Sequence, residues 1–255
     1  SILPTTTQYA RNALMSGLMP LQIKEMYPQY WVDDTEEEAK NLYEENLIDL
    51  LLKRYRKNIN FSYHKINSSQ EGEKLVEKLP QLKDNQLNVC VLNFIDMLSH
   101  SRTEMRVLKE IARSETAYRA LSVNWFKYSP TLQLFKDLAA SDYKVIVTTD
   151  HGTVCVNKPI KVIGDKNTTT NLRYKVGKAL NYNKNEVFDI TNPQKAMLPS
   201  PNVSSTYIFA KNRNFMAYPN NFNYYATYFK DSFQHGGISM EEMIIPIITL
   251  HSKKY

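Results

Sequence analysis

Two near-continuous apolar runs constrain the fold of this chain more than any other feature. The first, "NVCVLNFID", spans residues 88–96, and the second, "VIVTTD", spans residues 145–150. Runs without polar alternation are typical of strands that are covered on both faces, as in parallel sheets. Stretches with helical spacing lie between such runs. The order of elements therefore predicts an α/β domain with a mostly parallel central sheet flanked by helices.

Both runs end on an aspartate that is followed by a histidine. His100 comes four residues after Asp96, and His151 follows Asp150 directly. Strands of an α/β sheet deliver their functional side chains at the carboxyl ends, so we expect both pairs at one edge of the sheet. A third histidine, His235, precedes a Gly-Gly turn that allows close approach of the backbone.

Carboxylate and imidazole together are the ligand set of zinc and of other borderline divalent metals. A single Asp-His pair is also explained by a capping aspartate and a surface histidine. Two pairs on successive strands, with a third histidine, predict a metal site. The remaining histidines, His64 and His251, have no acidic residues arranged around them, and we expect them to be structural or exposed.

The opening segment "SILPTTTQYARNALMSG" predicts a helix from Gln8 to Ser16 that ends at Gly17. Thr7 then stands at the helix N-terminus, a natural place for an anion, although the threonines of this segment are also good helix caps. Arg11 lies one turn later and shares the face of Thr7. The pair is consistent with a threonine nucleophile beside a phosphate clamp.

Composition narrows the class of protein. The chain has 255 residues, of which 42% are hydrophobic, enough for one large domain or two modest ones. The net charge is +6, but the basic residues are spread along the chain, so we interpret them mostly as solvated helix faces. No apolar run approaches the ~20 residues of a membrane-spanning helix. Two cysteines in apolar runs favour reduced, buried thiols and a cytoplasmic protein without membrane insertion.

Four motifs together resemble the PglZ-type domain of the alkaline phosphatase superfamily, as found in the output domain of PorX-like response regulators that control type IX secretion. They are "PTTTQYARNALMSGLMP", "FIDMLSHSR", "TTDHGT" and "HGGISMEEMIIP", and the resemblance spans residues 1–255. It implies an alkaline-phosphatase-like fold with two Zn²⁺ ions and Thr7 as the nucleophile. The metal that activates Thr7 would be held by Asp150 and His151. The second metal would be held by Asp96, His100 and His235.

The resemblance also implies an activity. The domain would be a zinc-dependent phosphodiesterase that acts on cyclic or short linear oligonucleotides, as the effector domain of a two-component response regulator. The candidate substrate-binding residues are Arg11, Asn12, Lys166, Arg173 and Lys175. The last three lie in "GDKNTTTNLRYKVGK", which is equally consistent with a hairpin that carries exposed bases. The alternatives are a phosphomonoesterase or phosphomutase of the same superfamily, and a signalling module without turnover.

One feature departs from the family pattern. The family has a further metal-binding aspartate on a first strand upstream of the nucleophile, and this sequence begins after that point. We therefore expect a fragment of a longer protein, with a receiver domain and a helical linker upstream. Expected partners are a sigma factor or another regulatory protein, and a second copy of the chain. The aromatic run "NNFNYYATYFKDSFQH" leads to His235 and would either stack nucleobases or fill a core.

Overall fold

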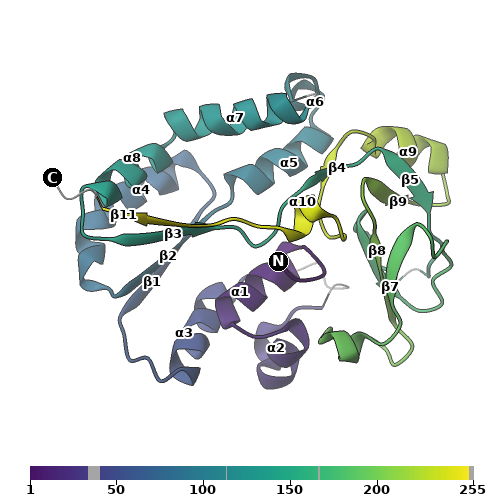
Figure 1. Ribbon diagram of the computed structural model, residues 1–255, viewed down its shortest axis with the longest axis horizontal. Helices are drawn as coiled ribbons and strands as arrows, with labels where there is room; N and C mark the ends of the chain where they lie inside the picture. The colour runs from purple at the N-terminus through teal and green to yellow at the C-terminus, as the bar shows by residue number, and fades with distance from the viewer. Residues whose placement is uncertain (34–40, 113, 166, 253–255) are drawn as a thin grey trace. The chain divides into compact units, whose positions relative to one another are not determined.

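The computed structural model describes residues 1–33, 41–112, 114–165 and 167–252 (Figure 1). The chain divides into two compact units. Unit 1 comprises Ser1–Tyr55 and Thr149–Ile245, and unit 2 comprises Arg56–Thr148 and Pro246–Tyr255. Among the described helices, none is both long and apolar enough to cross a membrane. Cys90 and Cys155 are free thiols, but the expectation that both are buried is wrong, because Cys90 is exposed and Cys155 is half-buried.

Unit 2 contains the first predicted strand in a β-α-β arrangement. Strand β1 (Phe61–Ile66) pairs in parallel with β2 (Leu87–Leu92), and helix α4 (Ser69–Lys78) connects them. Helix α4 begins at a capping box, in which the Ser68 hydroxyl accepts from the backbone of Glu71 and the Glu71 carboxylate accepts from the backbone of Ser68. This local sequence therefore sets where α4 starts.

The second predicted strand, β3 (Lys144–Thr148), pairs antiparallel with β11 (Ile247–His251), which lies beside it in Figure 1. Helices α4 and α8 (Pro130–Ala139) pack together through a small core of Leu75, Leu79 and Leu134. The other helices of unit 2 are η3 (Leu79–Asp84), α5 (Phe94–Glu104), α6 (Arg106–Ile111) and α7 (Glu115–Tyr128).

The mixed α/β class is confirmed, but the expectation of one large, mostly parallel sheet is not. The described residues form small sheets of two or three strands, of which β1–β2 and the β5–β9 pair of unit 1 are parallel. The predicted strand 88–96 was also too long. Strand β2 ends at Leu92 because its partner β1 ends at Ile66, and helix α5 begins two residues later. Asp96 therefore lies in the first turn of a helix.

The described residues of unit 1 form three small sheets. Its strands are β4 (Val154–Cys155), β5 (Lys158–Lys161), β6 (Tyr174–Gly177), β7 (Val187–Ile190), β8 (Thr206–Ala210), β9 (Asn214–Ala217) and β10 (Phe233–Gln234). The sheets are β6-β8-β7, β5-β9 and β10-β4. One apolar cluster forms around Ile208 and Met216, and another around Val156 and Phe215. Helix α9 (Phe222–Phe229) lies against the second cluster, beside β5 and β9 (Figure 1).

The predicted opening helix is present and ends where expected. It consists of a π-helical turn, η1 (Thr7–Arg11), followed by α1 (Asn12–Ser16). Gly17 terminates it in the left-handed region, with φ of 63°. The further helices of unit 1 are α2 (Pro20–Met26), η2 (Pro28–Tyr30), α3 (Glu44–Arg54), η4 (Pro193–Ala196) and α10 (Met240–Met243). Helix α3 lies beside α1 in Figure 1.

A fully buried ion pair holds the end of unit 1 together. Glu242 and Arg173 have no exposed side-chain surface, and the Glu242 carboxylate accepts from Arg173 Nε at 3.0 Å and from Nη2 at 2.6 Å. The same carboxylate accepts from the backbone N–H groups of Gly237 and Ser239 at 2.9 and 3.1 Å. Arg173 also donates to the carbonyl of Asn214. Both oxygens of this carboxylate therefore accept hydrogen bonds, which the burial of a charge requires.

We predict that Glu242→Gln destabilises the protein strongly, because it leaves the Arg173 charge buried without its counter-ion. Removal of one partner of such a pair costs about 3 to 5 kcal/mol. The neighbouring Glu241 is exposed, so Glu241→Gln should change the free energy of unfolding by less than about 0.5 kcal/mol. Denaturant unfolding of both variants measures the difference, and equal stability of the two would contradict the prediction.

Candidate metal centre

Asp150 and His151 occupy a tight loop that follows β3. The Thr149 hydroxyl donates to the carbonyl of His151 at 2.9 Å, and the N–H of Gly152 donates to the carbonyl of Glu242 at 3.0 Å. A Cβ atom on Gly152 would lie 1.9 Å from the carbonyl oxygen of Glu241, so only glycine fits here. The loop therefore holds His151 in one place, and its side chain is buried.

Thr7 begins the π-helical turn, and its hydroxyl Oγ1 lies 3.2 Å from Nε2 of His151. The threonines of the segment do not simply cap the helix. Thr6 occupies the N-cap position without a side-chain cap hydrogen bond. The Thr5 hydroxyl instead donates to the carbonyl of Gly237 at 2.8 Å and accepts from the N–H of Gly236 at 3.0 Å. The opening segment is thus tied to the turn that follows His235.

The Gly-Gly turn after His235 gives the backbone the close approach that the sequence predicted. Gly236 has φ of 119°, a conformation that side chains rarely adopt. A Cβ atom on Gly237 would lie 2.8 Å from the carbonyl oxygen of Ala210. Both positions exclude larger residues, so the turn packs directly against the opening segment and β8.

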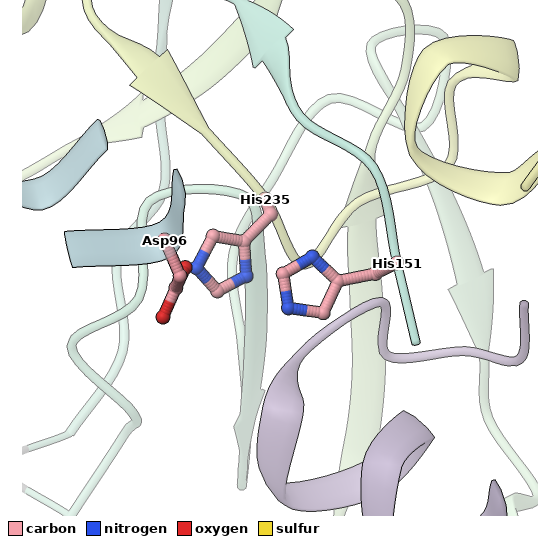
Figure 2. A group of neighbouring side chains, drawn as sticks. All are labelled: Asp96, His151 and His235. Atoms are coloured by element: carbon pink, nitrogen blue, oxygen red, sulfur yellow. The ribbon is translucent and has the colours of Figure 1, made fainter. Parts of the chain in front are cut away.

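His151 and His235 lie side by side (Figure 2). Their rings are stacked with centroids 4.1 Å apart and an interplanar angle of 16°, and each offers a ring nitrogen within 4.8 Å of the other. Nδ1 of His151 donates to the carbonyl of Gly152 at 3.0 Å, and Nδ1 of His235 donates to the carbonyl of Thr5 at 3.2 Å. These bonds place the proton on Nδ1 in both rings and the lone pair on Nε2.

This arrangement fits a divalent metal. Metal-ligating histidines commonly donate their second ring N–H to a backbone carbonyl, which fixes the tautomer and the orientation of the ring. Both rings are oriented in this way, and Oδ2 of Asp150 lies 3.8 Å from Nε2 of His151. Imidazole nitrogen and carboxylate oxygen are donor types that suit zinc. Within unit 1, the structure therefore brings together the predicted residues Thr7, Asp150, His151 and His235.

Asp96 and His100 lie in unit 2. Both belong to helix α5, where Asp96 is in the first turn and accepts a hydrogen bond from the Ser99 hydroxyl through its backbone carbonyl, at 2.7 Å. The side chain of His100 lies outside the described residues. The roles of Asp96 and His100 as metal ligands stay predictions from their motif.

Arg11 does not have the surroundings of a phosphate clamp. Its side chain is buried, its Nε donates to Asp150 Oδ2 at 3.2 Å, and its Nη1 lies 3.5 Å from Oε1 of Glu44. Sequence reasoning missed Glu44, which is 1% exposed. A glutamate in the first turn of a helix is already explained by its interaction with the helix dipole. The sequence gives no sign that Glu44 pairs with Arg11, which lies 33 residues earlier.

The four other predicted substrate contacts have different surroundings. Arg173 is committed to Glu242, which argues against its predicted role in a substrate groove. Asn12 is 2% exposed, and Lys166 lies outside the described residues. Lys175 is 4% exposed, its Nζ donates to the carbonyl of Thr169 at 2.8 Å, and the same atom lies 4.6 Å from the ring centroid of Tyr218. The alternative of a hairpin with exposed bases is therefore wrong for Arg173 and Lys175.

His64 and His251 have the surroundings expected for residues outside a site. His64 lies on β1, where its Nε2 is 3.0 Å from the Ser62 hydroxyl, and His251 is exposed on β11. The sequence interpretation of both is confirmed.

We predict that Lys175→Met stabilises the protein most at low pH. Burial lowers the pKa of Lys175 from 10.5 to about 7. Between these values the unfolded chain binds a proton that the folded protein does not, so the parent gains stability as the pH rises, and the variant lacks this gain. The stability advantage of the variant should therefore be larger at pH 6 than at pH 9, as measured by denaturant unfolding at both pH values.

The control is Lys178→Met, the same substitution at an exposed position of the same segment. It should show no comparable dependence on pH. A difference between the parent and Lys175→Met that stays constant from pH 6 to pH 9 would show that the amine of Lys175 titrates normally.

Comparison with known proteins agrees with the geometry of the site. The model of the BREX system PglZ alkaline phosphatase-like domain matches residues 1–250. No curated protein matches the chain. The family match indicates a phosphoric ester hydrolase, and it carries no information on a receiver domain or on type IX secretion. This chain belongs to the family of PglZ alkaline phosphatase-like domains.

Proposed function

We propose that this chain is a metal-dependent phosphoric ester hydrolase in which Thr7 is the nucleophile. The observation that carries the proposal is the contact of the Thr7 hydroxyl with Nε2 of His151 at 3.2 Å, beside the Asp150 carboxylate. A hydroxyl at the start of a helical turn, next to two metal-type ligands, is placed to be activated as a nucleophile. Family membership supports the reaction class.

The metals in this proposal are two Zn²⁺ ions. Asp150, His151 and Thr7 would hold one, and the contacts of His151 Nε2 with the Thr7 hydroxyl at 3.2 Å and with Asp150 Oδ2 at 3.8 Å support this set. For the second we propose His235 with Asp96 and His100, on the strength of the sequence motifs. When bound, such ions stabilise the attacking and leaving oxygens of an in-line displacement at phosphorus.

The reaction of the chain itself has two steps. The Thr7 oxygen forms a bond to phosphorus while the bond from phosphorus to the leaving oxygen breaks. The hydroxyl proton passes to solvent, and the leaving oxygen takes up a proton from solvent to depart as an alcohol. Water then hydrolyses the phosphothreonine and restores the Thr7 hydroxyl. The backbone bonds of Thr5 to Gly236 and Gly237 hold the nucleophile segment in place for both steps.

We predict that Thr7→Ala lowers turnover by about 10³-fold or more, because both chemical steps depend on this hydroxyl. The fold should be retained, since Thr7 is not part of the core, and most of the zinc should stay bound through the other proposed ligands. Steady-state kinetics on the zinc-loaded protein measures the loss.

Thr6→Ala is the matched control. The Thr6 hydroxyl is buried and has no hydrogen-bond partner in the structure, so this variant should keep its activity. If Thr7→Ala retained activity close to that of the parent, water would be attacking phosphorus directly, and the covalent route would be wrong.

We propose a phosphodiester substrate, namely a cyclic or short linear oligonucleotide. A monoester dianion needs more positive charge at its site than a diester monoanion, and Arg11 is already paired with two carboxylates. The aromatic run before His235 is divided between two roles. Phe222, Tyr225 and Phe229 pack on the core, whereas Tyr224 and Tyr228 are exposed with their rings stacked. Exposed aromatic rings of this kind support the stacking of nucleobases.

The biological setting follows from the sequence resemblance alone. We propose an effector domain of a response regulator in the cytoplasm, with a receiver domain upstream. A sigma factor or another regulatory protein, and a second copy of the chain, are its proposed partners. The alternatives are a phosphomonoesterase or phosphomutase, and a signalling module without turnover.

We predict that the zinc-loaded protein hydrolyses a chromogenic diester, bis-p-nitrophenyl phosphate, in preference to the monoester p-nitrophenyl phosphate. The physical reason is the small positive charge at the site. Comparison of kcat/KM for the two compounds, followed by dinucleotides, provides the measurement. A monoester preference of about tenfold or more in kcat/KM, without cleavage of any dinucleotide, would favour the phosphatase alternative. No turnover of any ester would favour the signalling module.

A further inference from the structure

Arg11 lies between two carboxylates of unit 1 that come from distant parts of the sequence. Its Nε donates to Oδ2 of Asp150 at 3.2 Å, and its Nη1 lies 3.5 Å from Oε1 of Glu44. The side chains of Arg11 and Asp150 are each 9% exposed, and that of Glu44 is 1% exposed. Helix α3, which begins at Glu44, lies beside α1, which begins directly after Arg11 (Figure 1).

Three buried charges in contact need a physical explanation. An Arg11–Asp150 pair alone would be neutral, and the addition of Glu44 makes the group net negative in a place where charge is costly. A second carboxylate buried at such a cost is retained where a cation joins it or where it fixes the geometry of its neighbours. Because Asp150 is a candidate metal ligand, Glu44 has a reason to fix the geometry of its neighbours.

The geometry of the guanidinium shows what Glu44 does. The five N–H groups of arginine form a fork that prefers to bind one carboxylate through two parallel hydrogen bonds. Here Nε donates to Oδ2 of Asp150, while Nη1 donates to Glu44, so the two N–H groups go to different carboxylates. Without Glu44, the fork could bind Asp150 with two parallel N–H groups and occupy both of its oxygens. With Glu44 in place, Asp150 is oriented by Nε at Oδ2 and by the Thr149 hydroxyl, 3.5 Å from Oδ1, and its remaining lone pairs are available to a metal.

We propose that Glu44 is a positioning residue, which holds Arg11 so that Asp150 is oriented as a metal ligand without being captured by the guanidinium. The proposal rests on the proposed function, because it takes Asp150 as a ligand. It also gives Arg11 a different role from the predicted phosphate clamp. Residues that orient metal ligands by hydrogen bonding, without binding the metal themselves, typically contribute a factor of about 10 to 100 in metal affinity.

The experiment measures binding of Zn²⁺ to the full chain by competition with a chromophoric chelator, for the parent and for Glu44→Gln. We expect the variant to bind one zinc about 10- to 100-fold more weakly. Glu45→Gln is the matched control, since Glu45 lies in the same first turn of α3 but is exposed. It removes the same charge from the helix terminus and should leave the affinity within about twofold of the parent, a difference of roughly 0.4 kcal/mol.

A second readout separates positioning from stability. The absorption spectrum of bound Co²⁺ reports the ligand geometry, and it should change in Glu44→Gln and stay unchanged in Glu45→Gln. Thermal unfolding without metal shows whether each variant is folded before metal is added. If Glu44→Gln does not fold, Glu44→Asp retains the charge with a shorter side chain and should show an intermediate loss of affinity.

The outcomes distinguish this proposal from the proposed function. A parent protein that binds neither Zn²⁺ nor Co²⁺ would overturn both. A parent that binds zinc, with affinity and spectrum equal in the folded Glu44 variants, would overturn the positioning role alone. Selective weakening in Glu44→Gln, with the control unchanged, would support it.

Discussion

Glu242 is the anchor on which both histidine loops depend. Its backbone carbonyl accepts the N–H of Gly152, directly after His151, at 3.0 Å. Its carboxylate accepts the N–H of Gly237, two residues after His235, at 2.9 Å. Because Glu242 bonds to both loops, this one buried residue fixes the positions from which the two imidazoles stack. Arg173 keeps that fixed point in place by neutralising its charge.

A buried ion pair also lies next to Asp150, another predicted metal ligand. Arg11 and Glu44 lie behind Asp150 as Arg173 and Glu242 lie behind His235. Buried ion pairs contribute little to net stability, because desolvation consumes most of the Coulomb gain. Their benefit lies in geometry. Each fixes the direction of several donors at once, and a metal site needs ligands that are oriented before the ion arrives.

The sequence predicted local features well, but it did not predict which strands pair with each other. The opening helix, its end at Gly17 and the Gly-Gly turn follow from local rules. The sheet organisation did not follow, because an apolar run predicts a strand but not its partner. The run at 145–150 pairs antiparallel with a segment about a hundred residues away.

The sequence also did not predict which charged residues are buried as ion pairs. Glu44, Arg173 and Glu242 have sequence neighbours that resemble those of any solvated helix or hairpin. Their partners lie 33 and 69 residues away, so only the folded chain shows that they are paired. Lys175 is the converse case: a lysine in a polar segment whose amine is buried against Tyr218.

The reassignment of Arg11 changes what the site can recognise. The positive charge expected to face a phosphate is already shared between Asp150 and Glu44. The nucleophile segment therefore brings no net positive charge of its own, and attraction for a substrate has to come from bound metal ions and from surfaces further away. Such a site discriminates against highly charged groups, since each added negative charge raises the repulsion from the buried carboxylates. The electrostatics of the nucleophile side of unit 1 thus supports the proposal of an ester that carries one negative charge at phosphorus, in which the exposed tyrosines of α9 would contact the rest of the molecule.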